Sequence, residues 1–262
     1  MKELTVTDPI GTVLVDDVSF SVRGGEVLVI AGVQGNGQTE ITEAIVGLQA
    51  HVEGSVRLNG VELVGRSVRD ILDDGVGFVP EDRSVDGLVK EFSIAENLML
   101  DRSVGGPFVK AGTLQLGALE EFAREKITEF DIRTQGPAQP AGRLSGGNQQ
   151  KVVLARELSR ELSLFVAAQP TRGVDVGSIE FIHKRIIETR DSGIPVIVIS
   201  TELDEAAALA DRIMVMYRGK VVGIVPGDTT REQLGLMMAG MIETDTTAVA
   251  ATTAADTEET SA

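Results

Sequence analysis

The residues best suited to chemistry lie in a glycine-rich segment early in the sequence. Residues 32–39 read GVQGNGQT and have the spacing of the phosphate-binding pattern GxxxxGK[ST], with Gln38 in place of the lysine. Glycines let several backbone N–H groups converge on phosphate oxygens at the start of a helix, so the segment could still cradle a nucleotide. The alternative is a glycine-rich turn between a strand and a helix that binds nothing.

The glutamine changes the electrostatics of this loop. An ammonium–phosphate pair at about 4 Å and an effective dielectric of about 20 contributes up to about 4 kcal/mol. A neutral hydrogen bond contributes about 1 kcal/mol. We therefore expect Gln38 to reduce nucleotide affinity without abolishing it. Thr39 could still touch Mg²⁺ through its hydroxyl, and we expect this contact to be weak.

A second candidate segment, residues 144–151, reads LSGGNQQK and opens a predicted helix. The hydroxyl of Ser145 and the free N–H groups of Gly146 and Gly147 would form a second anion site at the helix N-terminus. The alternative for this octapeptide alone is a solvated helix cap followed by glycines. Its position after the glycine loop favours the anion site.

LSGGNQQK resembles the signature of ATP-binding-cassette (ABC) ATPases, specifically their sugar-importer branch. The resemblance runs from about residue 3 to residue 240 and is closest to the second cassette of tandem ATPase subunits serving bacterial simple-sugar and nucleoside importers. It is also carried by IAGVQGNGQTE at 30–40, FVPEDRSVDGL at 78–88, AAQPTRGVDVG at 167–177 and STELDEAAALADRIMVMYRGKVVG at 200–223. The last two segments point toward the nucleoside type.

The resemblance implies an α/β fold, a P-loop NTPase ABC cassette with a RecA-like α/β core, an antiparallel β subdomain and a helical signature subdomain. The nucleotide-binding domain would cover 1–242, with the helical subdomain at about 92–150. Residues 243–262 are acidic, rich in Thr and Ala and without aromatic residues. Such a composition cannot bury enough apolar surface to order itself, so we expect a disordered tail.

The resemblance also implies that the hydrolytic machinery is degenerate. In ABC proteins an aspartate that holds the magnesium shell and a glutamate that polarises the attacking water precede the residue matching Pro170. Ala168 and Gln169 stand there in this chain, and Thr201 replaces the histidine that senses the γ-phosphate. With Gln38, these four positions leave no catalytic residue expected intact. Losing a catalytic base costs about 10²–10⁴ in rate, so we expect negligible hydrolysis at this loop.

The implied cofactor is ATP, with Mg²⁺ bound weakly through Thr39 or supplied by a partner. Arg83 and Arg172 lie in matching family segments, where either dimer coupling or a surface salt bridge would explain them. Glu81 takes the place of a glutamine in the segment between the subdomains. The positions expected to contact nucleotide are Gly32, Gly35, Asn36, Gly37, Gln38, Thr39, Glu81, Ser145, Gly146, Gly147, Asn148, Gln149 and Asp175.

Hydrophobic periodicity places these segments on regular elements. Strands are expected at 4–7, 12–15, 18–22, 27–30, 164–168 and 195–200, and hairpins at 55–64 and 213–225. Helices are expected at 39–47, 94–100, 116–130 and 178–190. A further helix would begin where Thr230 and Gln233 cap each other reciprocally.

Composition narrows the function classes. The 262 residues carry a net charge of −16, which disfavours nucleic acid as a partner. Cysteine is absent, which excludes disulfides and thiolate metal sites. The two histidines, His51 and His183, have no metal-like spacing. No apolar stretch approaches the roughly 18 residues that span a bilayer, and no secretion signal is evident.

The resemblance implies that two cassettes pair head to tail, each nucleotide lying between one chain's phosphate loop and the other's signature. This chain would lend its signature to a catalytic cassette, in the same longer chain or a separate subunit. Two transmembrane permease subunits and, indirectly, a solute-binding protein would complete an importer for nucleosides or simple sugars. The location would be cytoplasmic, peripheral on the inner face of the membrane. The alternatives are a self-sufficient ATPase, a nucleotide-free structural cassette and an ABC protein acting on nucleic acid or ribosomes.

Overall fold

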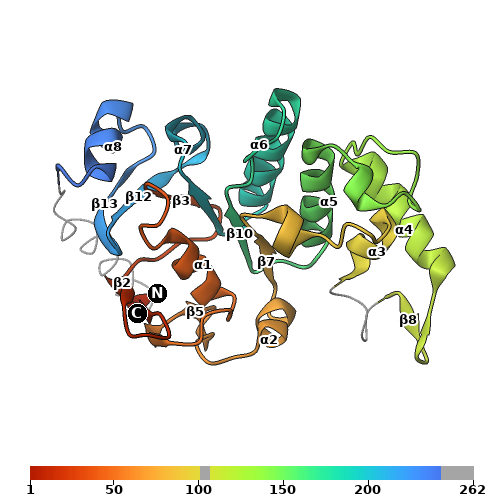
Figure 1. The fold of residues 1–262 in the computed structure, drawn as a ribbon, viewed down its shortest axis with the longest axis horizontal. Coiled ribbons are helices and arrows are strands. Elements are labelled where there is room, and N and C mark those ends of the chain that lie inside the picture. The colour runs from red at the N-terminus through yellow and green to blue at the C-terminus, as the bar shows by residue number, and fades with distance from the viewer. Residues whose placement is uncertain (101–106, 243–262) are drawn as a thin grey trace, which may run out of the picture. The chain divides into compact units, whose positions relative to one another are not determined.

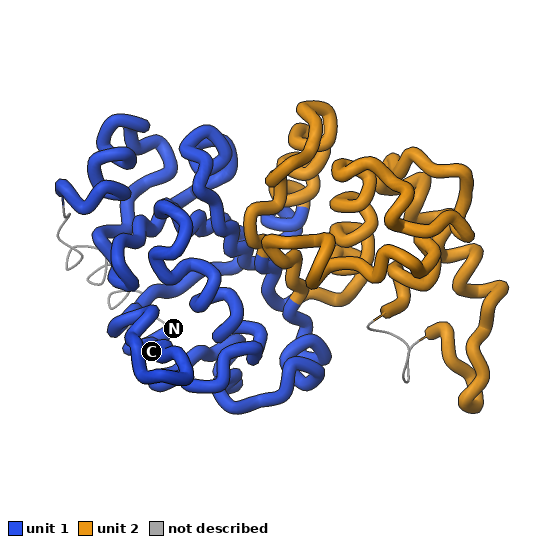
Figure 2. The backbone as a smooth tube through the Cα atoms, viewed as in Figure 1, with its two compact units in different colours: residues 1–76, 163–166, 189–262 blue, residues 77–162, 167–188 orange. Residues whose placement is uncertain are grey.

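The computed structural model describes residues 1–100 and 107–242, so the expected tail at 243–262 lies outside the described residues. The chain forms two compact units (Figure 2). Among the described residues, unit 1 comprises 1–76, 163–166 and 189–242, and unit 2 comprises 77–100, 107–162 and 167–188. None of the described helices is both long and apolar enough to cross a bilayer.

The main sheet has six strands in the order β13-β12-β3-β11-β10-β7 (Figure 1). Strand β3 pairs in parallel with β11 and β12, and β13 adds an antiparallel edge. The chain passes from one unit to the other within β7 and β10. The strands are β3 (Val27–Ala31), β7 (Val76–Val79), β10 (Leu164–Ala168), β11 (Val196–Ser200), β12 (Arg212–Tyr217) and β13 (Lys220–Pro226).

Burial explains why the sequence forms this sheet. Every residue of β3, β10 and β11 is buried, as expected for apolar runs in parallel strands that are covered on both faces. Helices α7 (Leu203–Leu209) and α8 (Arg231–Met238) pack against the strands of unit 1, α7 on β3 and α8 on β12. Helix α1 (Gln38–Ile45) follows β3 directly, so strand, glycine loop and helix occur in the predicted order.

A smaller antiparallel sheet in unit 1 has the order β2-β1-β4. The sequence predicted separate strands at 12–15 and 18–22, and this was wrong, because one strand ends at Val18. Phe20 lies beyond the strand but is buried, and it exchanges backbone hydrogen bonds with Met1 at 3.2 and 2.9 Å. The elements are β1 (Lys2–Thr7), β2 (Val13–Val18), β4 (Val52–Ser55), the hairpin β5 (Arg57–Leu58) and β6 (Val61–Glu62), and α2 (Val68–Asp73).

Unit 2 is mainly helical. Helix α3 packs against both α4 and α5, and α5 also packs against a π-helical turn at Arg83–Gly87. Ser93 and Glu96 form a reciprocal capping box at the start of α3. The elements are α3 (Ile94–Met99), the hairpin β8 (Val109–Lys110) and β9 (Thr113–Leu114), α4 (Leu116–Glu129), a 3₁₀ turn (Ala141–Arg143), α5 (Gly146–Leu158) and α6 (Val176–Asp191), whose last residues belong to unit 1.

A buried ion pair within α5 bonds that helix to β7 and to the segment that follows it. Arg156 Nε lies 2.7 Å from Glu157 Oε1, and the two side chains are 9% and 4% exposed. The second oxygen of Glu157 accepts from Phe78 N at 3.3 Å, and Arg156 Nη1 donates to Gly87 O at 2.8 Å. Because buried charges are costly unless they are paired and hydrogen-bonded, these bonds hold the 78–88 segment firmly on α5.

Candidate nucleotide-binding segments

The glycine loop between β3 and α1 depends on backbone conformations that favour glycine. Gly35 and Gly37 have φ of 84° and 100°. A Cβ at Gly37 would lie 2.9 Å from Leu14 O, so a larger residue would also clash. The N-cap position of α1 is Gly37, which offers no side-chain cap to the first amides of the helix. The loop therefore has the geometry of an anion cradle.

The side chain of Gln38 folds back onto this loop and bonds two of its backbone groups. Gln38 is only 4% exposed. Its Oε1 accepts from Asn36 N at 3.1 Å, and its Nε2 donates to Val33 O at 3.2 Å. A Cβ at Gly32 would lie 2.3 Å from Gln38 Nε2, so the amide sits tightly against the loop backbone. A loop amide that a phosphate oxygen would require is thus already hydrogen-bonded within the chain.

Asn36 fixes the same loop to the turn between β12 and β13. Its Oδ1 accepts from Arg218 N at 2.7 Å, and its backbone oxygen accepts from Gly219 N at 3.1 Å. Its Nδ2 donates to Val33 O at 2.9 Å. Asn36, predicted to contact nucleotide, therefore uses its side chain to hold the loop in shape.

The positions expected to be degenerate carry no carboxylate. Ala168 and Gln169 end β10 and follow it, with Gln169 9% exposed and at φ 48°, and Thr201 follows β11. Within residues 1–100 and 107–242, no cluster of three or more His, Cys, Asp or Glu side chains could hold a metal ion. Thr39 could offer a hydroxyl, and Ala168 and Gln169 offer no carboxylate, so a Mg²⁺ ion here would take its remaining ligands from the phosphates and water.

Glu81 is held by a charge partner within unit 2. Arg172 Nη1 forms an ion pair with Glu81 Oε1. Arg83 donates to the backbone of the same loop, from Nη1 to Arg172 O at 2.7 Å and from Nη2 to Gly173 O at 3.4 Å. Burial lowers the pKa of Arg83, partly offset by Asp82. The two arginines thus fasten the 81–83 segment to the loop before α6, and the Arg172–Glu81 ion pair is the salt bridge that the sequence left open as an alternative to dimer coupling.

The signature segment presents free donors at the start of α5. Ser145 is the N-cap, and its Oγ accepts from Asn148 N at 3.4 Å. Within the described residues, the amides of Gly146 and Gly147 have no hydrogen-bond acceptor, as is usual for the first turn of a helix. Ser145 is exposed. The three residues are adjacent in the first turn of α5, where Gly146 is partly exposed and Gly147 is buried.

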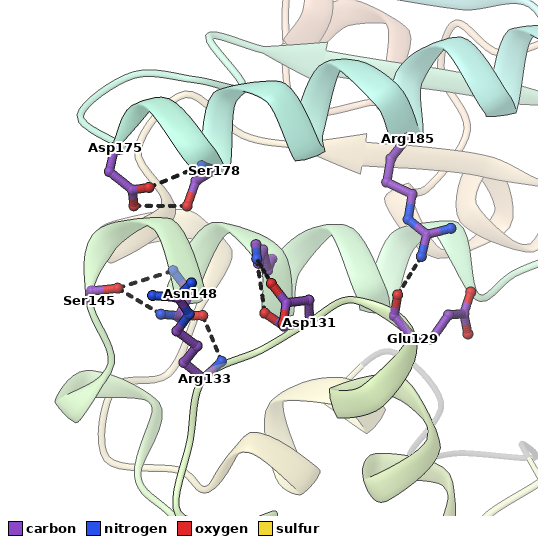
Figure 3. A network of polar contacts seen from close by, with 9 residues as sticks. Glu129, Asp131, Arg133, Ser145, Asn148, Asp175, Ser178 and Arg185 are labelled. Atoms are coloured by element: carbon purple, nitrogen blue, oxygen red, sulfur yellow. Dashed lines mark hydrogen bonds and ion pairs between the residues drawn. The ribbon is translucent and has the colours of Figure 1, made fainter.

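Close packing explains the two signature glycines. A Cβ at Gly146 would lie 2.5 Å from Arg83 Nη2, and one at Gly147 would lie 2.2 Å from Ser178 Oγ. Asp175, predicted to contact nucleotide, caps α6, accepting from Ser178 Oγ at 2.8 Å and Ser178 N at 3.0 Å (Figure 3). These bonds lower the pKa of Asp175. Sequence reasoning missed Ser178, although an aspartate three residues before a serine is a helix-capping spacing.

Three further signature residues serve the structure of unit 2. Gln149 Nε2 donates to Ala141 O and Leu144 O, both at 3.3 Å. Lys151 Nζ donates to Asp131 O at 2.9 Å and Oδ2 at 3.0 Å and lies 4.5 Å from the ring centre of Phe181. Asn148 accepts from the backbone N–H of Arg133, a contact that no sequence pattern indicated.

Cations gather at the carboxyl end of α4. Lys151 donates to the backbone oxygen of Asp131, just after that helix. Arg185 donates to Glu129 O (Figure 3), and its guanidinium lies 4.6 Å from the ring centre of Phe130. Positive charge at a helix C-terminus is stabilising. These contacts join α4, α5 and α6 and thereby set the direction of the signature helix.

Lys151→Met is expected to lower the free energy of unfolding by about 1–3 kcal/mol, because it removes a charged hydrogen-bond donor and a cation–π contact. Urea unfolding followed by circular dichroism measures the change. Lys184→Met is the matched control, since Lys184 is 73% exposed and lies 3.7 Å from Glu188. It should change stability by less than about 0.5 kcal/mol. Equal effects of the two variants would contradict the structural role of Lys151.

The chain resembles known import proteins over most of its own length. It is 46% identical over 238 residues to the guanosine import ATP-binding protein NupO of Bacillus subtilis, covering 90% of this chain and 47% of NupO. It is 45% identical over 241 residues to the nucleoside import ATP-binding protein NupA of Lactococcus lactis, covering 92% of this chain and 48% of NupA. The chain therefore spans about half the length of these relatives.

Solved structures agree on the fold. The dimeric structure of MJ0796, a bacterial ABC transporter cassette, superposes with a TM-score of 0.74 at 22% identity, covering 87% of this chain and 98% of that chain. This likeness confirms the predicted fold class. A family model described as ABC transporter matches residues 15–172, more than half of the sequence. The chain therefore belongs to the ABC transporter family.

Proposed function

We propose that this chain is the ATP-binding domain of an importer for nucleosides or simple sugars. Its own glycine loop does not hydrolyse ATP, and its signature segment completes the ATP site of a partner cassette. The names of NupO and NupA, a guanosine and a nucleoside import protein, support the solute class. The ribose import ATP-binding protein RbsA of Lacticaseibacillus paracasei, 39% identical over 228 residues, supports the sugar alternative.

The observation that carries the proposal is the contrast between the two segments. Gln38 fills its own loop with hydrogen bonds at 3.1 and 3.2 Å, whereas Ser145, Gly146 and Gly147 keep their donors unused within the described residues. A phosphate reaching the loop must displace an internal partner and gains no ammonium. A phosphate reaching the signature meets donors that are already aligned on the axis of a 13-residue helix.

The chemistry follows from what each side supplies. The partner cassette would bring the lysine, the metal-anchoring carboxylate and the water-polarising glutamate that this chain lacks. Ser145, Gly146 and Gly147 would donate to the γ-phosphate and stabilise the charge that builds up there during transfer. Preorganised donors contribute most in a closed site from which water is excluded, so the signature acts when the two cassettes are closed together.

The assembly proposed is that of a tandem importer subunit. This chain would be the second cassette, with a catalytic cassette in the same longer chain or in a separate subunit. The length of the relatives, about twice that of this chain, is compatible with two cassettes in one subunit. Two transmembrane permease subunits and a solute-binding protein would complete it. The cassettes would lie in the cytoplasm against the inner face of the membrane. We further propose a nucleotide-binding domain at 1–242, with a helical subdomain at about 92–150.

The test mixes the full chain with a cassette that carries the missing lysine and glutamate, and phosphate release from ATP is measured. We expect no release by this chain alone and at least a tenfold rise in the partner's turnover when the chain is added, within the range that aligned donors contribute. A partner turnover that does not respond to the added chain would contradict the proposal.

A second candidate function, a nucleotide-free structural cassette, is favoured by the internal bonds of Gln38. In that case the loop would bind no ATP at all. Calorimetric titration of ATP into the full chain separates the two functions. Measurable binding excludes the structural cassette. If the chain binds no ATP and does not stimulate the turnover of a partner, it is a structural cassette.

A further inference from the structure

We propose that Asn148 is a positioning residue that sets the hydroxyl of Ser145 as a pure hydrogen-bond donor toward the bound phosphate. This inference rests on the proposed function of the signature segment. It names the residue that makes the Ser145 hydroxyl a donor rather than an acceptor. Asn148 lies in the first turn of α5, between Ser145 and the chain at Arg133 (Figure 3).

The orientation of the Asn148 amide is set by Arg133. The backbone N–H of Arg133 lies 2.8 Å from the side-chain atom Oδ1 of Asn148. A backbone N–H can only donate, so the atom facing it must be the amide oxygen. The amide nitrogen then necessarily faces Ser145, and the distance from Nδ2 to Ser145 Oγ is 2.8 Å.

Ser145 accepts twice from the same residue. Its Oγ receives Nδ2–H of Asn148 at 2.8 Å and the backbone N–H of Asn148 at 3.4 Å. A serine hydroxyl has two acceptor lone pairs and one hydrogen. Because both lone pairs face Asn148, the hydrogen is the only part of the group left for a ligand.

The orientation of the Ser145 hydroxyl determines which ligands it can bind. A hydroxyl held in this way bonds an oxyanion and offers nothing to an ammonium, a guanidinium or an amide N–H. The hydroxyl is therefore a third hydrogen-bond donor to the ligand, beside the backbone N–H groups of Gly146 and Gly147. Asn148 does this without touching the phosphate itself.

Asn148→Asp should reverse the arrangement. A carboxylate has no hydrogen to give to Ser145, so the serine hydroxyl would turn and donate its own hydrogen to the new carboxylate. The phosphate would then lose that donor. The variant should still fold, because an acidic residue in the first turn of a helix is favourable. The added negative charge also repels phosphate, so the charge effect and the orientation effect must be separated.

A double-mutant cycle separates them. Inorganic phosphate is titrated into the ¹⁵N-labelled full chain, and affinity is read from the backbone amide shifts of Gly146 and Gly147. Asn148→Asp is measured alone and on top of Ser145→Ala. If Asn148 acts through the hydroxyl, Asn148→Asp should weaken binding about tenfold more when Ser145 is present, which is about the contribution of one hydrogen bond to a charged group. The same fold-loss in both backgrounds would be charge repulsion alone and would overturn the proposal.

A ligand-free measurement keeps the proposal testable whatever the phosphate affinity. In Ser145→Ala, the side-chain amide protons of Asn148 should move upfield as they lose their acceptor, while the backbone amide proton of Arg133 stays in place. Unchanged Asn148 side-chain resonances would overturn the proposal. If phosphate moves neither Gly146 nor Gly147 in the unaltered chain, the Asn148 resonances still decide how the Ser145 hydroxyl is oriented, and the proposed function is tested separately by the response of a partner's turnover.

Discussion

Ser145→Arg is expected to lower the ATP turnover of a mixture of this chain and a catalytic cassette by about 10²–10³-fold, the loss seen when one preorganised donor is removed from a closed site. The hydroxyl disappears, and the arginine side chain fills the space before the amides of Gly146 and Gly147. A cation at a helix N-terminus is also unfavourable. Phosphate release at saturating ATP measures the effect.

The control for this experiment is Ser192→Arg, the same change at an exposed serine of unit 1. It should leave the turnover of the mixture within about twofold, since surface substitutions usually change stability by less than about 0.5 kcal/mol. Thermal unfolding of both variants checks that they are folded. Equal turnover of the two mixtures would mean that the signature of this chain does not serve the partner site.

The second large effect concerns nucleotide affinity at the glycine loop. Gln38→Lys should raise the affinity for ATP by about 100-fold, because the difference between a charge pair and a neutral hydrogen bond is about 3 kcal/mol at most. Gln38→Ala should also raise affinity, by up to about tenfold, since the phosphate no longer competes with two internal hydrogen bonds. Isothermal titration calorimetry measures both.

The sign of the Gln38→Ala result is the informative part. If Gln38 were a nucleotide ligand, as the sequence predicted, its removal would weaken binding. If it occupies the loop, as its bonds to Asn36 and Val33 indicate, its removal strengthens binding. Thr39→Ala serves as the contrast, because loss of a hydroxyl from the loop offers no such gain. Weaker binding by Gln38→Ala would contradict the occupied-loop account.

The core strands were predictable because burial on both faces leaves a signal in the sequence. The apolar runs at 27–30, 164–168 and 195–200 matched β3, β10 and β11 within one residue at each end. Helix α5 was predictable because a serine cap and two glycines precede its apolar pattern. These elements place both candidate segments at the start of a helix.

Short elements were harder to predict because a strand of two residues is too short to show a hydrophobic period in the sequence. The hairpin β8–β9 has two residues per strand, and its turn at Ala111 and Gly112 has φ of 50° and 76°. It was missed, as was α2. The reciprocal cap expected at Thr230 and Gln233 is formed on one side, where Thr230 accepts from Gln233 N.

The contacts of the candidate sites depend on the tertiary fold. Nothing in the spacing of GVQGNGQT shows whether Gln38 faces a ligand or its own loop, since that depends on where Val33 O and Asn36 N lie. Arg133 and Ser145 are also linked only through the folded chain. Asp175 is the exception, because Ser178 three residues later could have indicated its capping role.

The most direct test of the account is the ATP turnover of the full chain by itself. The purified chain is incubated with ATP and Mg²⁺, and phosphate release is compared with that of the Gln38→Ala variant and of buffer. We predict that neither protein exceeds the buffer rate, because Ala168 and Gln169 supply no carboxylate even when the loop is cleared. Sustained phosphate release by the unaltered chain would contradict the account.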